Sequence, residues 1–138
     1  MLKEKLKIGI IAAEHSGDRL GSKLLESLKN IFEVDLYGLG GPEVASNKIV
    51  TPEGINYKDL HVMGLIDPLI NLPKILSIRK KLLNLFILNE IDIFIGVDSP
   101  DFNMFFHKKL KHNNIKTIQV VSPSVWSWRE NRIHAIQA

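Results

Sequence analysis

Residues 91–103, with the sequence IDIFIGVDSPDFN, constrain the fold more than any other stretch of the chain. They begin as a short apolar run rich in isoleucine, which is typical of a strand buried on both faces of a parallel sheet. The run ends at Asp98, and the next two residues, Ser99 and Pro100, favour the N-cap and the first position of a helix. The apolar positions that follow recur at helical spacing: Phe102, Phe105, Phe106 and Leu110. The stretch therefore predicts a central strand that ends at Asp98 and a helix that begins at Pro100.

Asp98 is the candidate catalytic residue because of where this strand ends. In an open α/β sheet, ligands bind at the edge where the carboxyl ends of the strands meet the following helices. A carboxylate at that edge can accept a proton from a substrate hydroxyl. We therefore expect Asp98 to face an open crevice there. Position alone leaves a second interpretation, in which Asp98 only caps a turn, because aspartate is a common turn residue.

The same alternation of strand and helix recurs along the chain and predicts the fold class. Strands are expected at residues 6–13, 34–39, 91–97 and 116–121, and helices from about residue 18, at 73–89 and from residue 100. A short edge strand is expected near residues 55–57. Repeated strand–helix units predict an α/β fold, a Rossmann-like parallel sheet flanked by helices, with right-handed crossovers.

Size and composition exclude several classes of protein. The 138 residues correspond to one domain, and the net charge of +3, without a run of five basic residues, does not suggest nucleic-acid binding. The chain contains no cysteine, which excludes disulfides and thiolate zinc sites. No apolar run approaches the ~20 residues that cross a bilayer. Residues 128–138 have the pattern of a helix that has only begun, so we expect the chain to be the N-terminal part of a longer protein.

Two loops at the predicted carboxyl edge are candidates for ligand contact. Ser16, Gly17 and Asp18 form the first strand-to-helix turn, and backbone N–H groups at a helix start attract anions. Gly40 and Gly41 follow the second strand and allow the backbone to approach a ligand closely. Each loop also has a purely structural interpretation, a capped tight turn in the first case and a sharp turn in the second.

Arg79 falls in the middle of the apolar face predicted for the helix at residues 73–89. That face consists of Ile75, Leu76, Leu82, Leu83 and Phe86. A buried cation requires a partner or a route to water. Either the Arg79 stem packs while its guanidinium reaches solvent, or the guanidinium pairs with an acid or a substrate phosphate. We favour the pairing, because the route to water is long from the centre of a face.

Two further segments have both a core and a ligand-binding interpretation. Residues 61–72 (HVMGLIDPLINL) are apolar and contain Met63, which either packs in the core or faces a lipid. Residues 122–129 (SPSVWSWR) carry two tryptophans, Trp126 and Trp128. Either the tryptophans close the core, or one of them stacks on a ring while Arg129 holds an anion.

Taken together, these loops resemble the motifs of the lipid-A-disaccharide synthases. AEHSGDRLG is similar to their GEASGDxLG, GLGGPEV to GxGGPxM, and DLHVMGLIDPL to ELxVMGxxEVL. GVDSPDFN and VVSPSVWSWR are similar to GxDxPDFN and YVSPSVWAWR, and the five motifs occur in the same order over nearly all of the chain. Ala13, His15 and Val44 depart from the family pattern. His15 departs most, because it places a bulky polar ring in a loop built from small residues.

The resemblance implies a bacterial inverting glycosyltransferase of the two-domain GT-B type, of which this chain is the N-terminal, acceptor-side domain. Such an enzyme joins UDP-2,3-diacylglucosamine to 2,3-diacylglucosamine 1-phosphate and releases lipid A disaccharide 1-phosphate and UDP. It needs no cofactor or metal and works in the cytoplasm, peripheral to the inner face of the cytoplasmic membrane. The C-terminal domain, which holds most of the nucleotide-sugar contacts, is absent, so we expect the chain alone to be inactive.

The resemblance also assigns roles to residues of the motifs. Asp98 is implied as the general base for the acceptor 6-hydroxyl. The substrate-binding residues implied are Glu14, Ser16, Gly17, Asp18, Gly40, Gly41, Met63, Arg79, Asn103, Ser122, Trp126 and Arg129. Lys74, Lys80 and Lys81 are expected to face anionic lipid headgroups.

Three alternative functions stay open from the sequence. One is another GT-B enzyme, such as a UDP-sugar epimerase, and a second is a non-catalytic module that binds a lipid or a partner. A dehydrogenase-type dinucleotide domain is the third and fits least, because the chain lacks the glycine fingerprint of that class.

Overall fold

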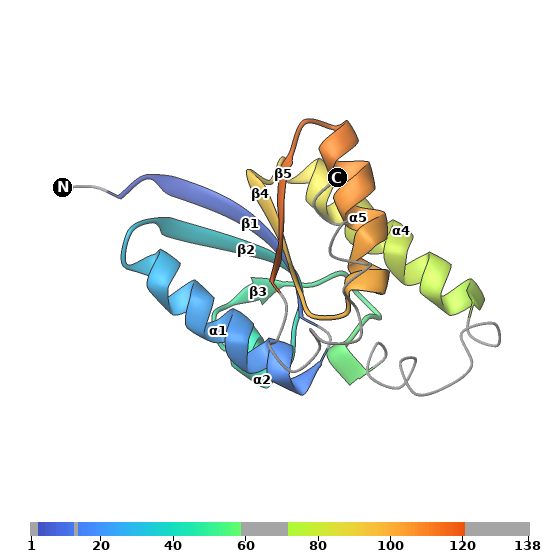
Figure 1. Ribbon diagram of the computed structural model, residues 1–138, viewed down its shortest axis with the longest axis horizontal. Coiled ribbons are helices and arrows are strands. Elements are labelled where there is room, and N and C mark those ends of the chain that lie inside the picture. The colour runs from blue at the N-terminus through green and yellow to red at the C-terminus, as the bar shows by residue number, and fades with distance from the viewer. Residues whose placement is uncertain (1–2, 13, 59–71, 121–138) are drawn as a thin grey trace, which may run out of the picture.

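Five parallel strands form the sheet, in the order β3-β2-β1-β4-β5 (Figure 1). The computed structural model describes residues 3–12, 14–58 and 72–120. The strands are β1 (Lys5–Ala12), β2 (Glu33–Leu39), β3 (Ile49–Val50), β4 (Ile93–Val97) and β5 (Lys116–Val120). The helices are α1 (His15–Lys29), α2 (Pro42–Ala45), α4 (Leu72–Leu88) and α5 (Pro100–His112). The predicted α/β class, a Rossmann-like parallel sheet flanked by helices, is confirmed.

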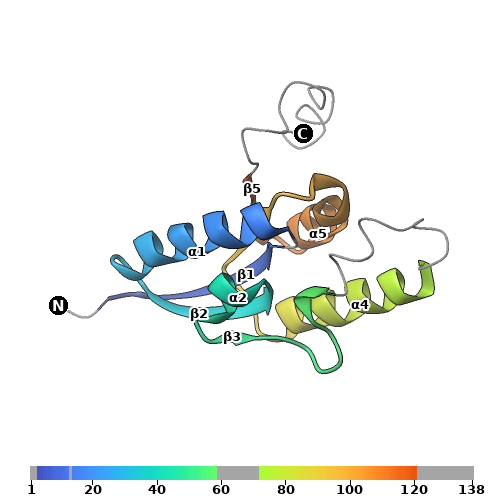
Figure 2. The ribbon, with the colours of Figure 1, turned by 90° about the horizontal axis from the view of Figure 1, so that it is seen from below.

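The central strands are buried on both faces because helices cover both sides of the sheet. Figure 2 shows α1 and α4 on opposite sides of the strands. On the α1 side, Ile8, Ile10 and Ala12 of β1 pack in one cluster with Leu25 of α1 and Val44 of α2. On the other side, Ile11 packs in a second cluster with Leu82 and Phe86 of α4, Phe94 of β4, and Phe106 and Leu110 of α5. This alternation along β1 explains why its sequence reads as an unbroken apolar run.

The strand order creates a switch point between β1 and β4. The chain runs outward from β1 through β2 to β3, and then returns to β4 on the opposite side of β1. Loops that leave the carboxyl ends of β1 and β4 therefore diverge from neighbouring positions, which is where open α/β sheets bind ligands. Ser16 lies in the first turn of α1, which follows β1, and Asp98 lies in the turn that follows β4.

The edge strand lies at Ile49–Val50, where it pairs with Leu36 and Tyr37 of β2. The prediction of an edge strand at residues 55–57 is therefore wrong. The chain leaves the sheet at Thr51, whose hydroxyl donates a hydrogen bond to the Gly38 carbonyl at 2.8 Å. Ile55 then enters the core cluster beneath α4, so its burial comes from helix packing and not from strand pairing.

Helix boundaries and faces differ from the sequence prediction in two places. Helix α1 begins at His15, three residues before the predicted start. The buried face of α4 is formed by Ile78, Leu82 and Phe86, whereas Leu76 is 51% exposed, so placing Leu76 on that face is wrong. Within the described part of the chain, no helix combines the length and the apolarity that a membrane span requires.

Candidate active site at the carboxyl edge of the sheet

Asp98 directly follows β4 and begins a turn with an unusual backbone conformation. Its φ is 51° and that of Ser99 is 39°, so two consecutive residues other than glycine lie in the left-handed region. Such residues are sterically strained and persist only where the surrounding structure holds them. Ser99 occupies the predicted N-cap position of α5, but its side chain makes no cap hydrogen bond. Its hydroxyl instead donates to Oε1 of Glu14 at 3.3 Å.

The Asp98 carboxylate lies against the turn between β1 and α1. Its Oδ2 accepts a hydrogen bond from the Ser16 hydroxyl at 3.0 Å. Gly17 lies beside the same oxygen, since a Cβ at position 17 would stand 3.1 Å from it. The structure thus brings Asp98, Ser16 and Gly17 together, as the sequence suggests. Asp98 is only 2% exposed, however, so the expectation that it faces an open crevice is wrong in this conformation.

The backbone of Asp98 is held by three hydrogen bonds from outside its own turn. Its N–H donates to the Val120 carbonyl at 2.7 Å. Its carbonyl oxygen accepts one hydrogen bond from the Asn103 side-chain amide and one from that of Gln119, both at 2.8 Å. Asn103 is fully buried and its amide supports the Asp98 turn, and its role in substrate binding stays a prediction.

Gln119 is oriented by His107, and neither residue is among those the sequence singled out. Because the Gln119 amide nitrogen donates to Asp98, its Oε1 is left as an acceptor for His107 Nε2, 2.8 Å away. His107 Nε2 therefore carries a hydrogen. Burial lowers the pKa of His107, and the hydrogen bond to Gln119 opposes this effect without overcoming it. His107 is consequently a neutral donor near pH 7.

Asp18 joins α1 to α2 as a helix cap. Its buried carboxylate accepts hydrogen bonds from the backbone N–H groups of Glu43 and Val44, each at 2.9 Å. Gly41 is required beside it, because a Cβ at that position would stand 2.6 Å from Asp18 Cγ. A Cβ at Gly40 would similarly stand 2.5 Å from the Val44 side chain. The space that these two glycines leave is filled by the protein itself, which favours the structural interpretation of both loops.

His15, the main departure from the family pattern, is accommodated by a contact with Tyr57. The Tyr57 hydroxyl lies 2.6 Å from His15 Nδ1, and the two rings meet edge to face with centroids 5.6 Å apart. Burial raises the pKa of Tyr57, and the charge of Asp18 adds to the effect, so the hydroxyl stays protonated. A groove of about 470 Å³ extends from Tyr57 along the Gly40–Gly41 turn.

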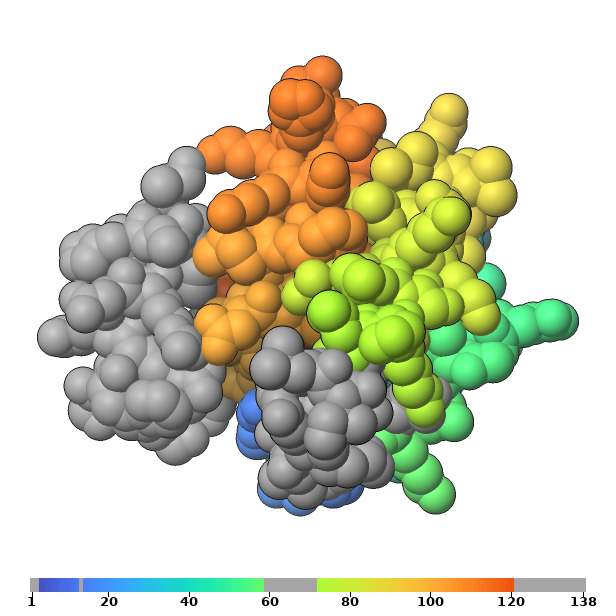
Figure 3. Space-filling view, turned by 90° about the vertical axis from the view of Figure 1, so that its right-hand side faces the viewer, coloured from blue at the N-terminus to red at the C-terminus, as the bar shows by residue number. Residues whose placement is uncertain are grey.

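Arg79 lies away from this turn, between α4 and α5. The two helices are side by side in Figure 3. The guanidinium lies over the rings of Phe102 and Phe105, with distances of 5.7 Å and 5.1 Å to the ring centres. Its Nε is buried without a hydrogen-bond partner. No carboxylate pairs with Arg79 in the part of the chain that the structure describes, where its guanidinium lies over aromatic rings. The other expected partner, a substrate phosphate, stays a prediction.

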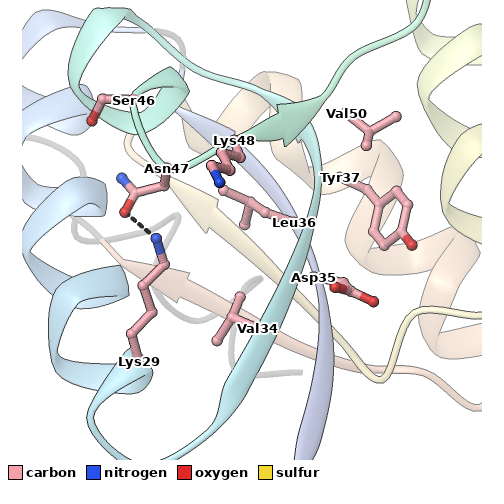
Figure 4. Close-up of a pocket in the computed structure, with 9 residues that line it drawn as sticks. All are labelled: Lys29, Val34, Asp35, Leu36, Tyr37, Ser46, Asn47, Lys48 and Val50. Carbon is pink, nitrogen blue, oxygen red and sulfur yellow. Dashed lines mark hydrogen bonds between the residues drawn. The ribbon is translucent and has the colours of Figure 1, made fainter.

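A second groove, of about 480 Å³, lies at the outer edge of the sheet beside β2 and β3 (Figure 4). Lys29 and Asn47 meet there through a hydrogen bond of 2.6 Å. None of the residues that line it belongs to the predicted substrate-binding set. The groove is therefore separate from the turn that carries Asp98.

Several sequence predictions fall outside the described residues. These are the substrate-binding roles of Met63, Ser122, Trp126 and Arg129, and the helix expected from residue 128. Among residues 3–12, 14–58 and 72–120, no group of three or more histidine, aspartate or glutamate side chains could hold a metal ion.

Comparison with known proteins gives a consistent result over the whole chain. Residues 8–138 match the family model described as lipid-A-disaccharide synthetase. The lipid-A-disaccharide synthase of Pseudoalteromonas translucida is 47% identical over 137 residues, which are 99% of this chain and 35% of the relative. The Pasteurella multocida and Vibrio cholerae enzymes of the same name are 44% and 39% identical over 97% and 99% of the chain. The chain thus spans about a third of the length of the curated relatives it matches.

Proposed function

Because the chain belongs to the lipid-A-disaccharide synthetase family, we propose that it forms the acceptor-side domain of a GT-B glycosyltransferase in lipid A biosynthesis. The reaction transfers 2,3-diacylglucosamine from its UDP conjugate to 2,3-diacylglucosamine 1-phosphate. The products are lipid A disaccharide 1-phosphate and UDP. The chain spans only about a third of its relatives, and in this proposal the other domain of the two-domain enzyme supplies most contacts to the UDP-sugar.

Asp98 is the general base in this proposal. As the acceptor 6-oxygen forms a bond to the anomeric carbon, the Asp98 carboxylate takes the hydroxyl proton. The bond from the anomeric carbon to the UDP oxygen breaks on the opposite face, so the configuration inverts and UDP leaves as an anion. A positioned base of this kind contributes typically about 10²–10⁴-fold to the rate.

The observation that carries the proposal is the strained turn at Asp98. Two adjacent left-handed residues, at the switch point of the sheet, aim a carboxylate at the β1–α1 turn. Backbone strain of this kind costs roughly 1–3 kcal/mol per residue and gathers at functional sites. Lys48, Glu90 and Asn114 also have positive φ, but among the described residues two such residues are adjacent only at Asp98 and Ser99.

The burial of Asp98 adds a condition to the mechanism. A base that is 2% exposed meets an acceptor hydroxyl only after the side chains that cover it have moved. The Ser16 hydroxyl donates to Oδ2 in the present conformation and, in this proposal, keeps the carboxylate oriented while the acceptor hydroxyl approaches. The first-turn N–H groups of α1 lie beside this position and carry a partial positive charge that stabilises anionic groups of the substrates.

We also propose that the protein works at the cytoplasmic face of the inner membrane, held there peripherally. Helix α4 supports this, because it exposes Leu72 and Leu76 together with Lys74, Lys80 and Lys81. Exposed leucines among lysines suit a surface of acyl chains and anionic headgroups. Co-sedimentation with vesicles tests it: binding to anionic vesicles that is lost at high salt supports contact, and equal recovery with neutral vesicles contradicts it.

Disaccharide formation is the direct test of the proposed reaction. A full-length protein that includes these residues should convert radiolabelled acceptor and UDP-2,3-diacylglucosamine into disaccharide. The 138-residue chain alone should give negligible product, since it lacks most UDP-sugar contacts. Epimerised UDP-sugar in place of disaccharide would identify a different GT-B activity, and lipid binding without turnover by the full-length protein would identify a non-catalytic module.

A further inference from the structure

The Asp98–Ser99 turn requires support that its own sequence does not provide. Both residues have positive φ and neither is glycine, so an isolated chain would rarely adopt this conformation. The carboxylate nevertheless meets Ser16 only if the turn holds this shape. What fixes the turn therefore also fixes the position of the proposed base.

The support comes from two side-chain amides that converge on one oxygen. Asn103 Nδ2 reaches the Asp98 carbonyl from the first turns of α5, and Gln119 Nε2 reaches it from β5. Both donor–acceptor distances are 2.8 Å. The carbonyl is thus held from a helix and from a neighbouring strand at once, which restricts the rotation of the peptide that follows Asp98.

The orientation of each side-chain amide is fixed by its hydrogen-bond partners. Asn103 Oδ1 is buried and has no hydrogen-bond partner, so the residue is oriented by what its nitrogen donates to. Gln119 is oriented at its other end by His107 Nε2, at 2.8 Å. His107 is itself fixed by burial and by an edge-to-face contact with Phe94, whose ring centre lies 5.2 Å away.

Gly96 leaves the space in which the amides meet. A Cβ at position 96 would stand 2.6 Å from Gln119 Oε1 and 2.8 Å from Asn103 Nδ2. Gly96 pairs with Gln119 in the register between β4 and β5, so the strand pairing itself delivers the glutamine to the end of β4. The arrangement therefore involves three elements, β4, α5 and β5.

We propose that Gln119, oriented by His107, and Asn103 are positioning residues that clamp the Asp98 carbonyl and so hold the catalytic carboxylate in place. The inference rests on the proposed function of Asp98. The three residues do not touch the substrate, and they act only through the Asp98 turn. Loss of the clamp should therefore lower kcat and leave KM nearly unchanged.

A first experiment tests the clamp without any assay of activity. Gln119→Met removes the amide but keeps the length of the side chain, and His107→Phe keeps the ring against Phe94 but removes the donor. Hydrogen exchange of the Asp98 N–H, followed by NMR on the 138-residue chain, should become at least about tenfold faster in both variants while β1 amides keep their rates. Equal acceleration of all protected amides, or an unchanged rate at Asp98, would overturn the proposal.

Two additional variants keep this experiment informative. His112→Phe makes the same replacement at an exposed position of α5 and should leave the Asp98 exchange rate unchanged. If Gln119→Met does not fold, Gln119→Glu takes its place. The glutamate still accepts the hydrogen bond from His107, but it has no N–H group to donate to the Asp98 carbonyl.

Kinetics of the full-length protein then separate the clamp from the proposed function. In His107→Phe and the Gln119 variant, kcat should fall by up to about 10²-fold with KM nearly constant. Unchanged kcat in both variants, with Asp98→Asn inactive, would overturn the positioning role alone. If Asp98→Asn is fully active, the assignment of the base is wrong and the positioning role falls with it, whereas the exchange rates still report whether the amides hold the turn.

Discussion

The Ser16 hydroxyl donates a hydrogen bond to Oδ2 of Asp98 at 3.0 Å, across 82 residues of sequence. This bond joins the first turn of α1 to the turn after β4, at the point where the strand order reverses. It also orients the oxygen to which we assign the proton transfer.

Ser16→Ala should reduce kcat of the full-length protein by roughly 10- to 100-fold, because a hydrogen bond to a charged group is worth roughly 1.5–3 kcal/mol. Ser16 is exposed, so the free energy of unfolding should change little. Ser27→Ala, at an exposed position of the same helix, is the matched control and should leave kcat unchanged. Equal kcat values for the two variants would remove Ser16 from the site.

Asp18→Asn should destabilise the fold by about 1–2 kcal/mol, because the carboxylate caps α2 through two backbone N–H groups. Urea unfolding of the 138-residue chain measures this change. Activity per folded molecule of the full-length protein should stay close to that of the parent. A loss of activity at unchanged stability would instead show that Asp18 binds substrate, as the family resemblance implies.

Arg79→Leu should change stability by less than about 1 kcal/mol, because two effects oppose each other. The variant loses the contact of the guanidinium with Phe102 and Phe105, but it also removes a buried nitrogen that has no partner. Activity of the full-length protein should fall if Arg79 also binds a substrate phosphate. Thermal unfolding and turnover, measured on the same samples, separate the two roles: lower stability with unchanged activity per folded molecule would make Arg79 structural.

The stability of the chain should fall as the pH drops below about 6.5, the ordinary pKa of histidine, because burial lowers the pKa of His107. A lowered pKa in the folded state means that the unfolded chain binds the proton more readily. The contribution of His107 to the free energy of unfolding is therefore fully present above its pKa in the unfolded chain. It is lost as the pH falls through its pKa in the folded chain.

His107→Phe isolates this effect between pH 7.5 and 5.5. In the parent, His107 should make the free energy of unfolding, measured with urea, fall with decreasing pH by at most about 1.4 kcal/mol per pH unit. The variant should lack this dependence. The matched variant His112→Phe should keep it. Identical slopes in the parent and in His107→Phe would show that His107 does not contribute.

The sequence predicted the parts of this fold that depend on local pattern. The apolar run before Asp98 was typical of a buried strand, and Pro100 with the following phenylalanines indicated α5. The position of Asp98 at the end of β4 followed directly. The edge strand was misplaced because β3 is only two residues long, too short for any alternation to appear.

The surroundings of Asp98 could not be derived in the same way. Gln119 reaches the turn only because β5 pairs with β4 in one register, which places Gln119 beside Gly96. His107 looked like any polar residue on a helix, and its role depends on which face α5 buries. The burial of Asp98 likewise depends on how the loops pack, which no single stretch of sequence reports.

Kinetics of Asp98→Asn in the full-length protein test the central claim most directly. Asparagine keeps the shape of the side chain but cannot take the proton from the 6-hydroxyl of the acceptor sugar. Asp101→Asn is the control, because it makes the same change at an exposed position in the first turn of α5. We expect kcat for disaccharide formation to fall by about 10²–10⁴-fold in Asp98→Asn. Asp101→Asn should match the parent. Equal turnover by the two variants, with both folded, would contradict the assignment of Asp98 as the base.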